Sequence, residues 1–384
     1  MNMEFTEKAS NLATTSRRRM MRGAAQAMTA GVAALGTNGV VAATTECTAP
    51  ARHNKAPQAS LTTVATFPPG YFLENLAVRE DNSVLVTVLN KKELWYVPQP
   101  KTDQLVTPLR LHTFEQLALG IAEVERDVFY IVTANIYANP SAPKLHRLDL
   151  RGWVPGRPVA PTPAFEFPTR ARATNGMCLV APGVLLVADS FAGLIWRINL
   201  GSSADKIEAK VWLEHSSMSH FPGKMKPEQP GVNGVRFAAK THHVYYTATA
   251  KKLLMRVAVD PSTLDPVGEP EIVVAGRMGD DLCLDEEAGV IYLTTHRQNT
   301  IDLVSMDPGE NSGFTQIVAG DPFTKELVGP SSGAWGRAPG DPGRVAYFTT
   351  DGGTASPLPT GLEPARLLRL EVQPLKGAFP GMGA

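Results

Sequence analysis

The sequence lacks several features that would assign it to a particular class of protein. Lysine plus arginine and aspartate plus glutamate number 37 each, so no net charge favours nucleic acid or an anionic membrane. Three cysteines in 384 residues exclude a disulfide scaffold, and no Cys/His spacing typical of structural zinc occurs. No apolar run reaches the ~18 residues that span a membrane. With 43% hydrophobic residues, an ordinary globular core is expected.

The first 59 residues differ in composition from the rest. Arginines at 17, 18, 19 and 22 precede a weakly apolar stretch rich in alanine and glycine, and Ala42 and Ala43 follow. This is the order of a secretory signal, although the long basic region also fits a disordered or organelle-directing leader. We expect a leader over residues 1–59, with a signal to about residue 43, and one folded domain over 60–384. A signal would send the protein to the secretory pathway or outside the cell; without one it stays cytoplasmic.

A repeated pattern runs through the folded domain. Each copy has a small polar lead, an apolar strand, a turn, a second apolar strand and a short third strand, as in NGMCLVAPGVLLVADSFAGLIWRINL from Asn175. Copies begin 47 to 58 residues apart, at the lead residues Glu74, Ile121, Asn175, Asn233, Asp280 and Ser331. Repeats of this length made of short strands are typical of β-propeller blades. The sequence therefore predicts an all-β protein, a six-bladed β-propeller with about four strands in each blade.

The second strand of each copy is the clearest. Runs rich in β-branched and aromatic residues predict strands at Val84–Val88, Val128–Val132, Val184–Ala188, Val244–Ala248 and Val290–Thr294. The loop His215–Pro230 leads directly into the Asn233 copy and is either a lid over one mouth of the channel or an ordinary surface loop. Cys178 and Cys283 follow the lead residues by three positions and are expected to be buried thiols.

The lead residues form the candidate site. Because the innermost strand of each blade lines the central channel, Glu74, Asn175, Asn233 and Asp280 should face the axis at one level, with Ile121 and Ser331 or Ser332 completing the circle. Two carboxylates and two amide oxygens suit a hard cation such as Ca²⁺ or Mg²⁺. Alternatively, these groups cap strand ends and bond to neighbouring backbone, as Asn-Gly pairs often do. In either case, facing carboxylates should perturb each other's pKa.

These four positions resemble the family of regucalcin (senescence marker protein 30) and the gluconolactonases, whose six-bladed propellers hold a divalent metal. The resemblance implies that Glu74, Asn175, Asn233 and Asp280 are metal ligands and that Asp280 is also the general base. The sequence departs from the lactonases at Glu-Asn-Leu in place of Glu-Gly-Pro, and at Asp281 where glycine is expected.

A longer resemblance, over about residues 65–372, is to a fungal branch of this superfamily in secondary metabolism. It is carried by YFLENLAVR from Tyr71, GIAEV from Gly120, ATNGM from Ala173, DDLCLD from Asp280 and SSGAWGR from Ser331. That branch includes hetero-Diels–Alderases of tropolonic sesquiterpenoid (meroterpenoid) biosynthesis. They join a tropolone-derived quinone methide to a humulene-type olefin.

Two functions follow from these resemblances. The first is cycloaddition, which needs no cofactor because holding two partners in one orientation supplies much of the acceleration. There the acids Asp280 and Glu74 would assist loss of water, while the substrates would be bound by Asn175, Asn233, Ser332, Trp335, Phe221 and Met278. The second is a metal-dependent lactonase, in which a Ca²⁺ or Mg²⁺ ion activates water and Asp280 accepts its proton. A propeller that only binds ligands is a third interpretation.

Overall fold

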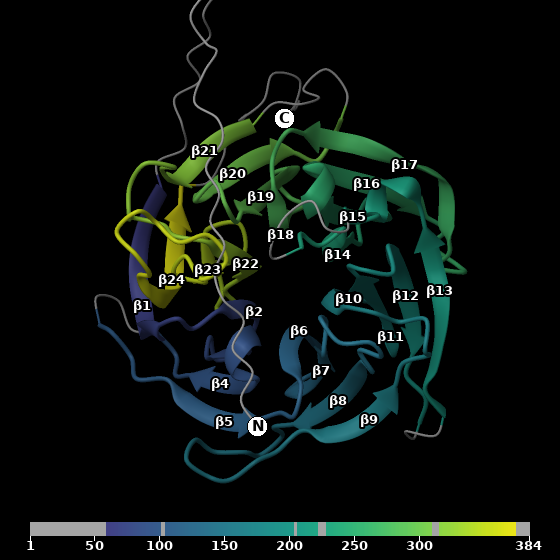
Figure 1. The fold of residues 1–384 in the computed structure, drawn as a ribbon, viewed down its shortest axis with the longest axis horizontal. Coiled ribbons are helices and arrows are strands. Elements are labelled where there is room, and N and C mark those ends of the chain that lie inside the picture. Colours follow the sequence, from purple (N-terminus) through teal and green to yellow (C-terminus); the bar gives the residue numbers. More distant parts are fainter. Residues whose placement is uncertain (1–58, 101–103, 203–205, 222–227, 309–314, 374–384) are drawn as a thin grey trace, which may run out of the picture. The chain divides into compact units, whose positions relative to one another are not determined.

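The computed structural model describes residues 59–100, 104–202, 206–221, 228–308 and 315–373. Most of the leader and residues 222–227 of the loop His215–Pro230, among them Met225, a residue expected to wall in the olefin, therefore lie outside the described residues. Among those described, no helix has both the length and the apolar character to cross a membrane. The prediction of a six-bladed all-β propeller is confirmed: six four-stranded sheets surround a central axis (Figure 1).

Five blades are consecutive in the sequence, each with its first strand innermost. The first is β2 (Leu73–Val78), β3 (Val84–Val88), β4 (Glu93–Val97) and β5 (Leu109–Thr113); the second is β6 (Leu117–Glu125), β7 (Val128–Ala134), β8 (Lys144–Asp149) and β9 (Thr162–Glu166). The third is β10 (Thr174–Ala181), β11 (Val184–Asp189), β12 (Leu194–Asn199) and β13 (Glu208–Glu214); the fourth is β14 (Val232–Ala238), β15 (His243–Ala248), β16 (Leu253–Val259) and β17 (Pro266–Ala275). The fifth is β18 (Gly279–Asp285), β19 (Val290–Thr295), β20 (Thr300–Ser305) and β21 (Thr315–Gly320).

The sixth blade joins the two ends of the described chain. Its inner strands are β22 (Pro330–Trp335), β23 (Val345–Thr350) and β24 (Pro364–Val372), and its outermost strand is β1 (Ala59–Pro69). β1 pairs antiparallel with β24, with Ser60 opposite Glu371. This closure was not predicted from the sequence, because β1 precedes the first copy of the repeat. It brings the start and the end of the described chain into one sheet and covers β24, which would otherwise be an edge strand.

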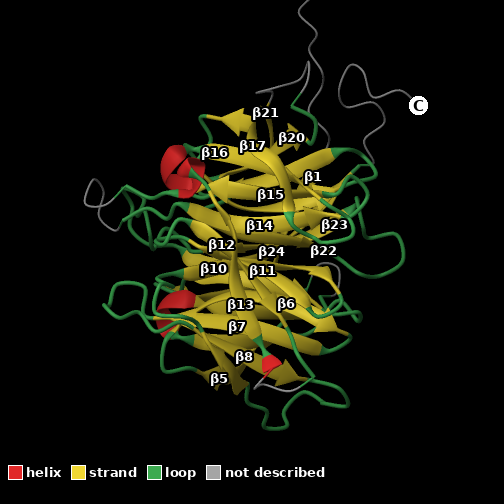
Figure 2. Ribbon diagram, turned by 90° about the vertical axis from the view of Figure 1, so that its right-hand side faces the viewer, coloured by secondary structure: helices red, strands yellow, loops and turns green. Residues whose placement is uncertain are grey.

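The second strands are buried because each lies between neighbouring blades. All five residues of β3 and all seven of β7 are buried, as the apolar runs predict. Cys178 and Cys283 are free and buried, which confirms the prediction of buried thiols. Burial raises the pKa of the Cys178 thiol to about 12. In the side view, loops and the short 3-10 helices η1 (Leu89–Lys91), η3 (Ser216–Met218) and η4 (Thr249–Lys251) connect the strands (Figure 2).

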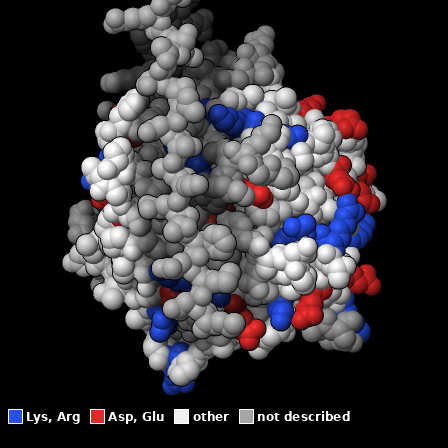
Figure 3. Space-filling view, viewed as in Figure 1, with Lys and Arg blue, Asp and Glu red and all other residues white. Residues whose placement is uncertain are grey.

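The outer surface carries charges of both signs. On the face viewed in Figure 3, basic and acidic side chains lie next to each other, without a large patch of one sign among the described residues. Several of them are exposed pairs, such as Arg170 with Glu214 at 2.6 Å. This distribution agrees with the zero net charge.

Candidate active site

A β-bulge marks the start of every innermost strand. The pairing of β10 with β11 shifts between Thr174 and Met177, and the pairing of β14 with β15 shifts between Val232 and Val235. The other four inner strands shift at the same place. A bulge inserts extra backbone and re-aims a side chain. Here it sets the direction of the lead residue of each repeat.

The strand register decides which residue each blade contributes. Glu74, Asn175, Asn233 and Asp280 occupy equivalent bulge positions, as the repeat predicts. In the second blade this position belongs to Leu119, since Ala118 pairs with Thr133 and Ile121 with Ile131. The expectation that Ile121 completes the circle is therefore wrong by two residues: Ile121 is buried in an apolar cluster. In the sixth blade the position belongs to Ser331, whose hydroxyl donates to the Leu73 carbonyl at 2.5 Å.

Blade-to-blade hydrogen bonds hold these residues in place. Thr247 Oγ1 accepts from the Gly234 backbone N–H at 2.8 Å and donates to the Asp280 carbonyl at 2.6 Å. Thr294 does the same between Asp281 and Ser331, at 2.9 and 3.0 Å. Glycine follows asparagine for a related reason: a Cβ on Gly234 would lie 2.4 Å from Asp281 Oδ1. The Asn-Gly pairs therefore mark close approach of neighbouring inner strands rather than turns.

The four oxygen-bearing residues line one cavity at a mouth of the channel. The cavity has a volume of about 90 Å³, and its polar lining also includes Ser190, Thr249, Glu228, Gln229 and His296. Its apolar lining is formed by Phe72, Leu89, Leu119, Ile136, Tyr137, Ala173, Phe191, Pro230 and Ala355. An engineered apolar cavity that binds benzene measures ~150 Å³. Side chains at this mouth must therefore move before an organic substrate can enter fully.

Glu74 is a buried carboxyl group without a hydrogen-bond partner among the described residues. Its residue is 7% exposed and lies against the cavity. Burial, followed by the negative charge of Asp280, raises the pKa of Glu74 well above its usual value. Most buried polar groups in proteins are hydrogen-bonded. A carboxyl group with a raised pKa and no such partner, facing a cavity, is therefore placed to bond to a ligand and to donate a proton to it.

Asp280 lies beside Glu74 and has more partners. It accepts a short hydrogen bond from Asn233 Nδ2, and His296 Nδ1 is 3.7 Å from its Oδ2. Burial raises the pKa of Asp280 to about 6, with His296 opposing the shift and the charges of Asp281 and Asp351 adding to it. The pKa values of both acids are thus raised, but Asp280 has hydrogen-bonding and ionic partners that Glu74 lacks among the described residues. Two neighbouring carboxyl groups with different environments can act as a base and an acid.

Sequence reasoning missed His296 and Asp351. His296 Nε2 is 3.2 Å from Asp351 Oδ2, and the imidazole ring stacks on Phe72 with a centroid distance of 5.4 Å. Although burial lowers it, the carboxylates of Asp351 and Asp280 raise the pKa of His296 to about 9. Both residues follow directly after a second strand, β19 and β23. Aligning that position in the repeat, as the lead positions were aligned, would have found them.

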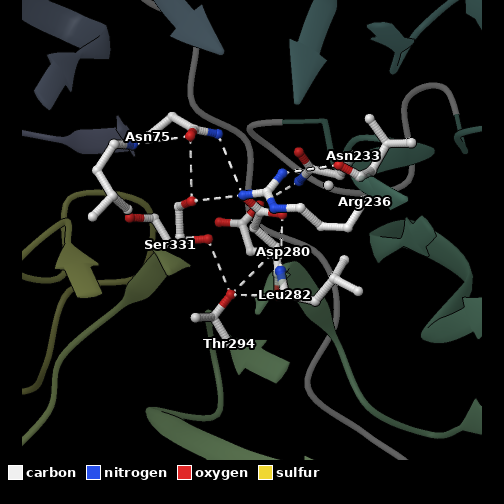
Figure 4. Close-up of polar contacts among 12 residues, drawn as sticks. Asn75, Asn233, Arg236, Asp280, Leu282, Thr294 and Ser331 are labelled. Carbon is white, nitrogen blue, oxygen red and sulfur yellow. Dashed lines mark hydrogen bonds and ion pairs between the residues drawn. The ribbon is translucent and has the colours of Figure 1, made fainter. Parts of the chain in front are cut away.

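A second polar layer closes the channel one residue deeper. Arg236 Nη2 lies 2.5 Å from Asp281 Oδ2, and Ser332 Oγ donates to the same oxygen at 2.6 Å. Asn75 Nδ2 also approaches Asp281 Oδ2, at 3.4 Å. Figure 4 shows Asn75, Ser331 and Asn233 arranged around Arg236 and Asp280. Ser332, expected to bind substrate, thus bonds within this layer and does not line the cavity.

The structure does not bring the other predicted substrate-binding residues into the cavity lining. Trp335 lies at the opposite end of β22, where its Nε1 donates to the Leu284 carbonyl at 2.6 Å and its ring meets Tyr292 edge-on. Met278 is 8% exposed, and Phe221 is 41% exposed with Lys251 Nζ 6.0 Å from its ring centroid. Only Glu74, Asn175, Asn233 and Asp280, of the predicted set, share the cavity.

The chemistry of the four residues fits a hard cation. Asn175 Nδ2 donates to Ser190 Oγ at 3.2 Å and Asn233 Nδ2 donates to Thr249 Oγ1 at 3.1 Å. Each of these bonds uses an N–H of the amide group and leaves the amide oxygen free to accept. Among the described residues no three His, Cys, Asp or Glu side chains group closely enough to hold a metal. A cation at this place would therefore depend on both asparagine oxygens as well as Glu74 and Asp280.

Comparison with known proteins identifies the type of fold. No family model matches the sequence, and no curated protein matches it. Solved structures do match: a calcium-binding regucalcin from Agrobacterium tumefaciens has a TM-score of 0.54 at 16% identity, covering 82% of this chain and 96% of that one. The fold is structurally like that of regucalcin and gluconolactonase.

Two further matches are enzymes. A gluconolactonase from Xanthomonas campestris has a TM-score of 0.55 at 13% identity, covering 83% of this chain and 91% of that one. A luciferin-regenerating enzyme has a TM-score of 0.54 at 16% identity, covering 83% and 98%. At these identities the likeness establishes the propeller alone, so the activity has to be argued from the cavity.

Proposed function

We propose that this regucalcin-like propeller is a biosynthetic enzyme of secondary metabolism, a hetero-Diels–Alderase. Its substrates would be a hydroxymethyl tropolone and a humulene-type sesquiterpene olefin. The observation that carries the proposal is the pair Glu74 and Asp280, two buried carboxyl groups with raised pKa values that line one cavity beside apolar walls. The sequence resemblance to the fungal branch supplies the substrate class.

The first step is loss of water from the tropolone. Glu74 donates its proton to the hydroxymethyl oxygen, the carbon–oxygen bond breaks, and water leaves. Asp280 takes the proton of the tropolone hydroxyl, so the electrons of that O–H bond form the carbonyl of the quinone methide. Each group then returns to its starting state by exchange with solvent. General acid–base assistance of this kind contributes typically 10²–10⁴-fold.

The second step joins the two partners without further proton transfer. The quinone methide contributes four atoms and the olefin two, so that one carbon–carbon and one carbon–oxygen bond form while all atoms are retained. Because the oxygens of the quinone methide only accept hydrogen bonds, Asn175 would hold one of them with the N–H that does not bond to Ser190, while Asn233 holds Asp280 beside it through its own N–H. Orientation of both partners in one site lowers the entropic part of the barrier, and it selects one face of the olefin.

Incubation of the protein with a hydroxymethyl tropolone and humulene tests this function. We expect faster formation of a single stereoisomer of the adduct than in buffer, where a mixture forms. Glu74→Gln keeps the size of the side chain but has no acidic proton, so it should slow the reaction about a hundredfold or more. Asp341→Asn, at the other end of the channel, is the control. Equal rates and equal isomer mixtures with and without protein would refute the proposal.

A metal-dependent lactonase is the second candidate. It is favoured by the equivalent positions of Glu74, Asn175, Asn233 and Asp280 and by the free amide oxygens. These four residues would hold the cation, which when bound polarises a carbonyl and acidifies water. Asp280 would then accept the proton of the attacking water. This proposal requires both Glu74 and Asp280 to be ionised, since protonated carboxyl groups bind cations poorly.

Hydrolysis assays separate the two candidates. Aldonolactones and an aryl ester are incubated with the protein in EDTA and after titration with Ca²⁺ or Mg²⁺. Turnover that needs metal and disappears in Asp280→Ala would establish the lactonase and displace the cycloaddition as the main activity. Absence of hydrolysis at every metal concentration, with stereoselective adduct formation in EDTA, would exclude the lactonase.

A further inference from the structure

One sector of the cavity is lined by apolar residues at both positions that the repeat places around the channel, the bulge position and the position after the second strand. At the bulge position, Leu119 stands in the second blade where the neighbouring blades carry Glu74 and Asn175. At the position after the second strand, Leu89 stands in the first blade and Asn135, which does not line the cavity, in the second, where the third to sixth blades carry Ser190, Thr249, His296 and Asp351. Both leucines line the cavity. The repeat thus loses its polar group twice, in adjacent blades.

Neighbouring loops enlarge this sector. Ile136 follows β7 and lines the cavity, and Leu89 and Ile136 pack against the apolar cluster that contains Leu119. Tyr137 and Phe191 continue the wall toward solvent, with ring centroids 6.4 Å apart. Tyr137 is 68% exposed, which is unusual for an apolar ring that lines a cavity. We call Leu89, Leu119, Ile136, Tyr137 and Phe191 the apolar wall.

We propose that the apolar wall is a separate binding subsite for the hydrocarbon partner of the reaction, a medium-ring olefin without polar groups. The inference rests on the proposed cycloaddition and adds the place of its second substrate. A hydrocarbon gains free energy from leaving water and needs no hydrogen bond, so leucine, isoleucine and aromatic side chains suit it. Glu74 and Asn175, on the flanking inner strands, bring the oxygen-bearing partner alongside.

The same wall disfavours sugar lactones. A sugar ring carries hydroxyl groups on every side, and those facing Leu119 and Ile136 would lose their hydrogen bonds to water without replacement. The polar sector alone therefore cannot distinguish the two candidate functions, whereas the apolar wall does. A hydrocarbon subsite accounts for Leu119 at the bulge position of the second blade, where four other blades carry an oxygen-bearing residue facing the cavity.

Binding of two separate probes tests the subsite. Humulene serves as the hydrocarbon probe and tropolone as the polar probe, each titrated alone into the full-length protein and followed by ligand-observed NMR. We expect Leu119→Asn and Ile136→Asn to weaken humulene binding about tenfold or more, because a hydrophobic contact of this size discriminates at that level. Tropolone binding should change less than twofold. Glu74→Gln should show the reverse pattern.

Control variants distinguish loss of binding from loss of folded structure. Leu109→Asn makes the same substitution on the outer strand β5, where Leu109 is 37% exposed, and should leave both affinities unchanged. Ile136 lies in a partly exposed loop, so Ile136→Asn remains informative if Leu119→Asn does not fold. Thermal unfolding of each variant identifies loss of structure.

The outcomes separate the subsite from the function. If wild-type protein does not bind humulene, or if Ile136→Asn binds it as well as wild type does, the subsite is refuted. If humulene binds at the apolar wall but no adduct forms with the tropolone, the cycloaddition fails while the subsite stands. If adducts form with unchanged KM for humulene in Ile136→Asn, the function stands and the subsite fails.

Discussion

The two ends of the channel contain similar acidic residues in different surroundings. At the mouth, burial raises the pKa of Glu74 and of Asp280, and the negative charges of neighbouring aspartates add to both shifts. At the far end, Asp127 lies 2.8 Å from Arg79, and Asp341 accepts a hydrogen bond from Asn82 at 2.6 Å. The far-end carboxylates are paired within the protein, whereas Glu74 at the mouth has no hydrogen-bond partner among the described residues. Unpaired, perturbed acids identify the functional end better than residue type does.

The volume of a cavity does not identify the functional end of the channel. A hollow of about 490 Å³ lies at the far end, between Trp335, Asp285, Lys240 and Arg344, and is larger than the mouth cavity. It is formed by the turns between first and second strands, and its charged side chains include Glu287, which extends into solvent and pairs with Lys240. A ligand site is recognised by convergent polar groups in a pocket that is largely apolar. The smaller cavity has such groups, and one of them, Glu74, has no hydrogen-bond partner among the described residues.

The largest expected effect separates the two ends by activity. Asp280→Asn removes the proton acceptor and should reduce turnover about 10²–10⁴-fold with little loss of folded protein. Asp341→Asn makes the same change at the far end and should leave turnover within about twofold. Initial rates for purified variants, with circular dichroism to verify folding, give the answer. If both variants lose activity equally, the distinction between the two ends is wrong.

A smaller effect, on stability, tests the layer that separates the ends. Arg236→Met leaves the Asp281 carboxylate buried without its cation and should lower the free energy of unfolding by about 3–5 kcal/mol. The double variant with Asp281→Asn should recover a large part of this loss. Denaturant unfolding measures both. As a comparison, Arg170→Ala breaks an exposed pair with Glu214 and should cost no more than about 1 kcal/mol. If Arg236→Met and Arg170→Ala lower the free energy of unfolding equally, the pair of Arg236 and Asp281 is exposed to water.

The smallest effect is the pH dependence of stability, which should come from the mouth. The folded pKa of His296 is raised to about 9 from its usual 6.5, so its stabilising contribution is complete below pH 6.5 and lost as the pH rises through 9. This amounts to about 3 kcal/mol. Unfolding of His296→Gln should show a smaller decline over that range. His242→Gln, on an exposed far-end turn, should decline as wild type does; a decline unchanged in His296→Gln would contradict the assignment.

The sequence predicted the blades well because their signal is local. The run Val84–Val88 is the observed β3, and the other four predicted second strands differ from the observed ones by at most two residues. Turn residues and β-branched alternation determine such boundaries over a few residues. The positions Glu74, Asn175, Asn233 and Asp280 followed from the same repeat, and the structure places all four in one cavity. Their catalytic and metal-binding roles stay predictions.

Long-range geometry accounts for what the sequence did not predict. Trp335 belongs to the same phrase as Ser331, but a strand carries residues four positions apart to opposite ends of the channel, at about 3.3 Å per residue. His296 and Asp351 form an ion pair between different blades, and no local pattern reports such a contact. Leu119 replaced Ile121 because a bulge shifts the register by an amount that the alignment of apolar residues does not contain.

By itself the sequence determined the number of blades, the residues that lead them and the balance of charge, because each depends on composition or on spacing along the chain. The tertiary structure decided which of those residues share a cavity, which acid lacks a partner and where the polar ring becomes apolar. These properties arise when six inner strands meet around one axis, so that burial and neighbouring charges from other blades set the chemistry of each side chain.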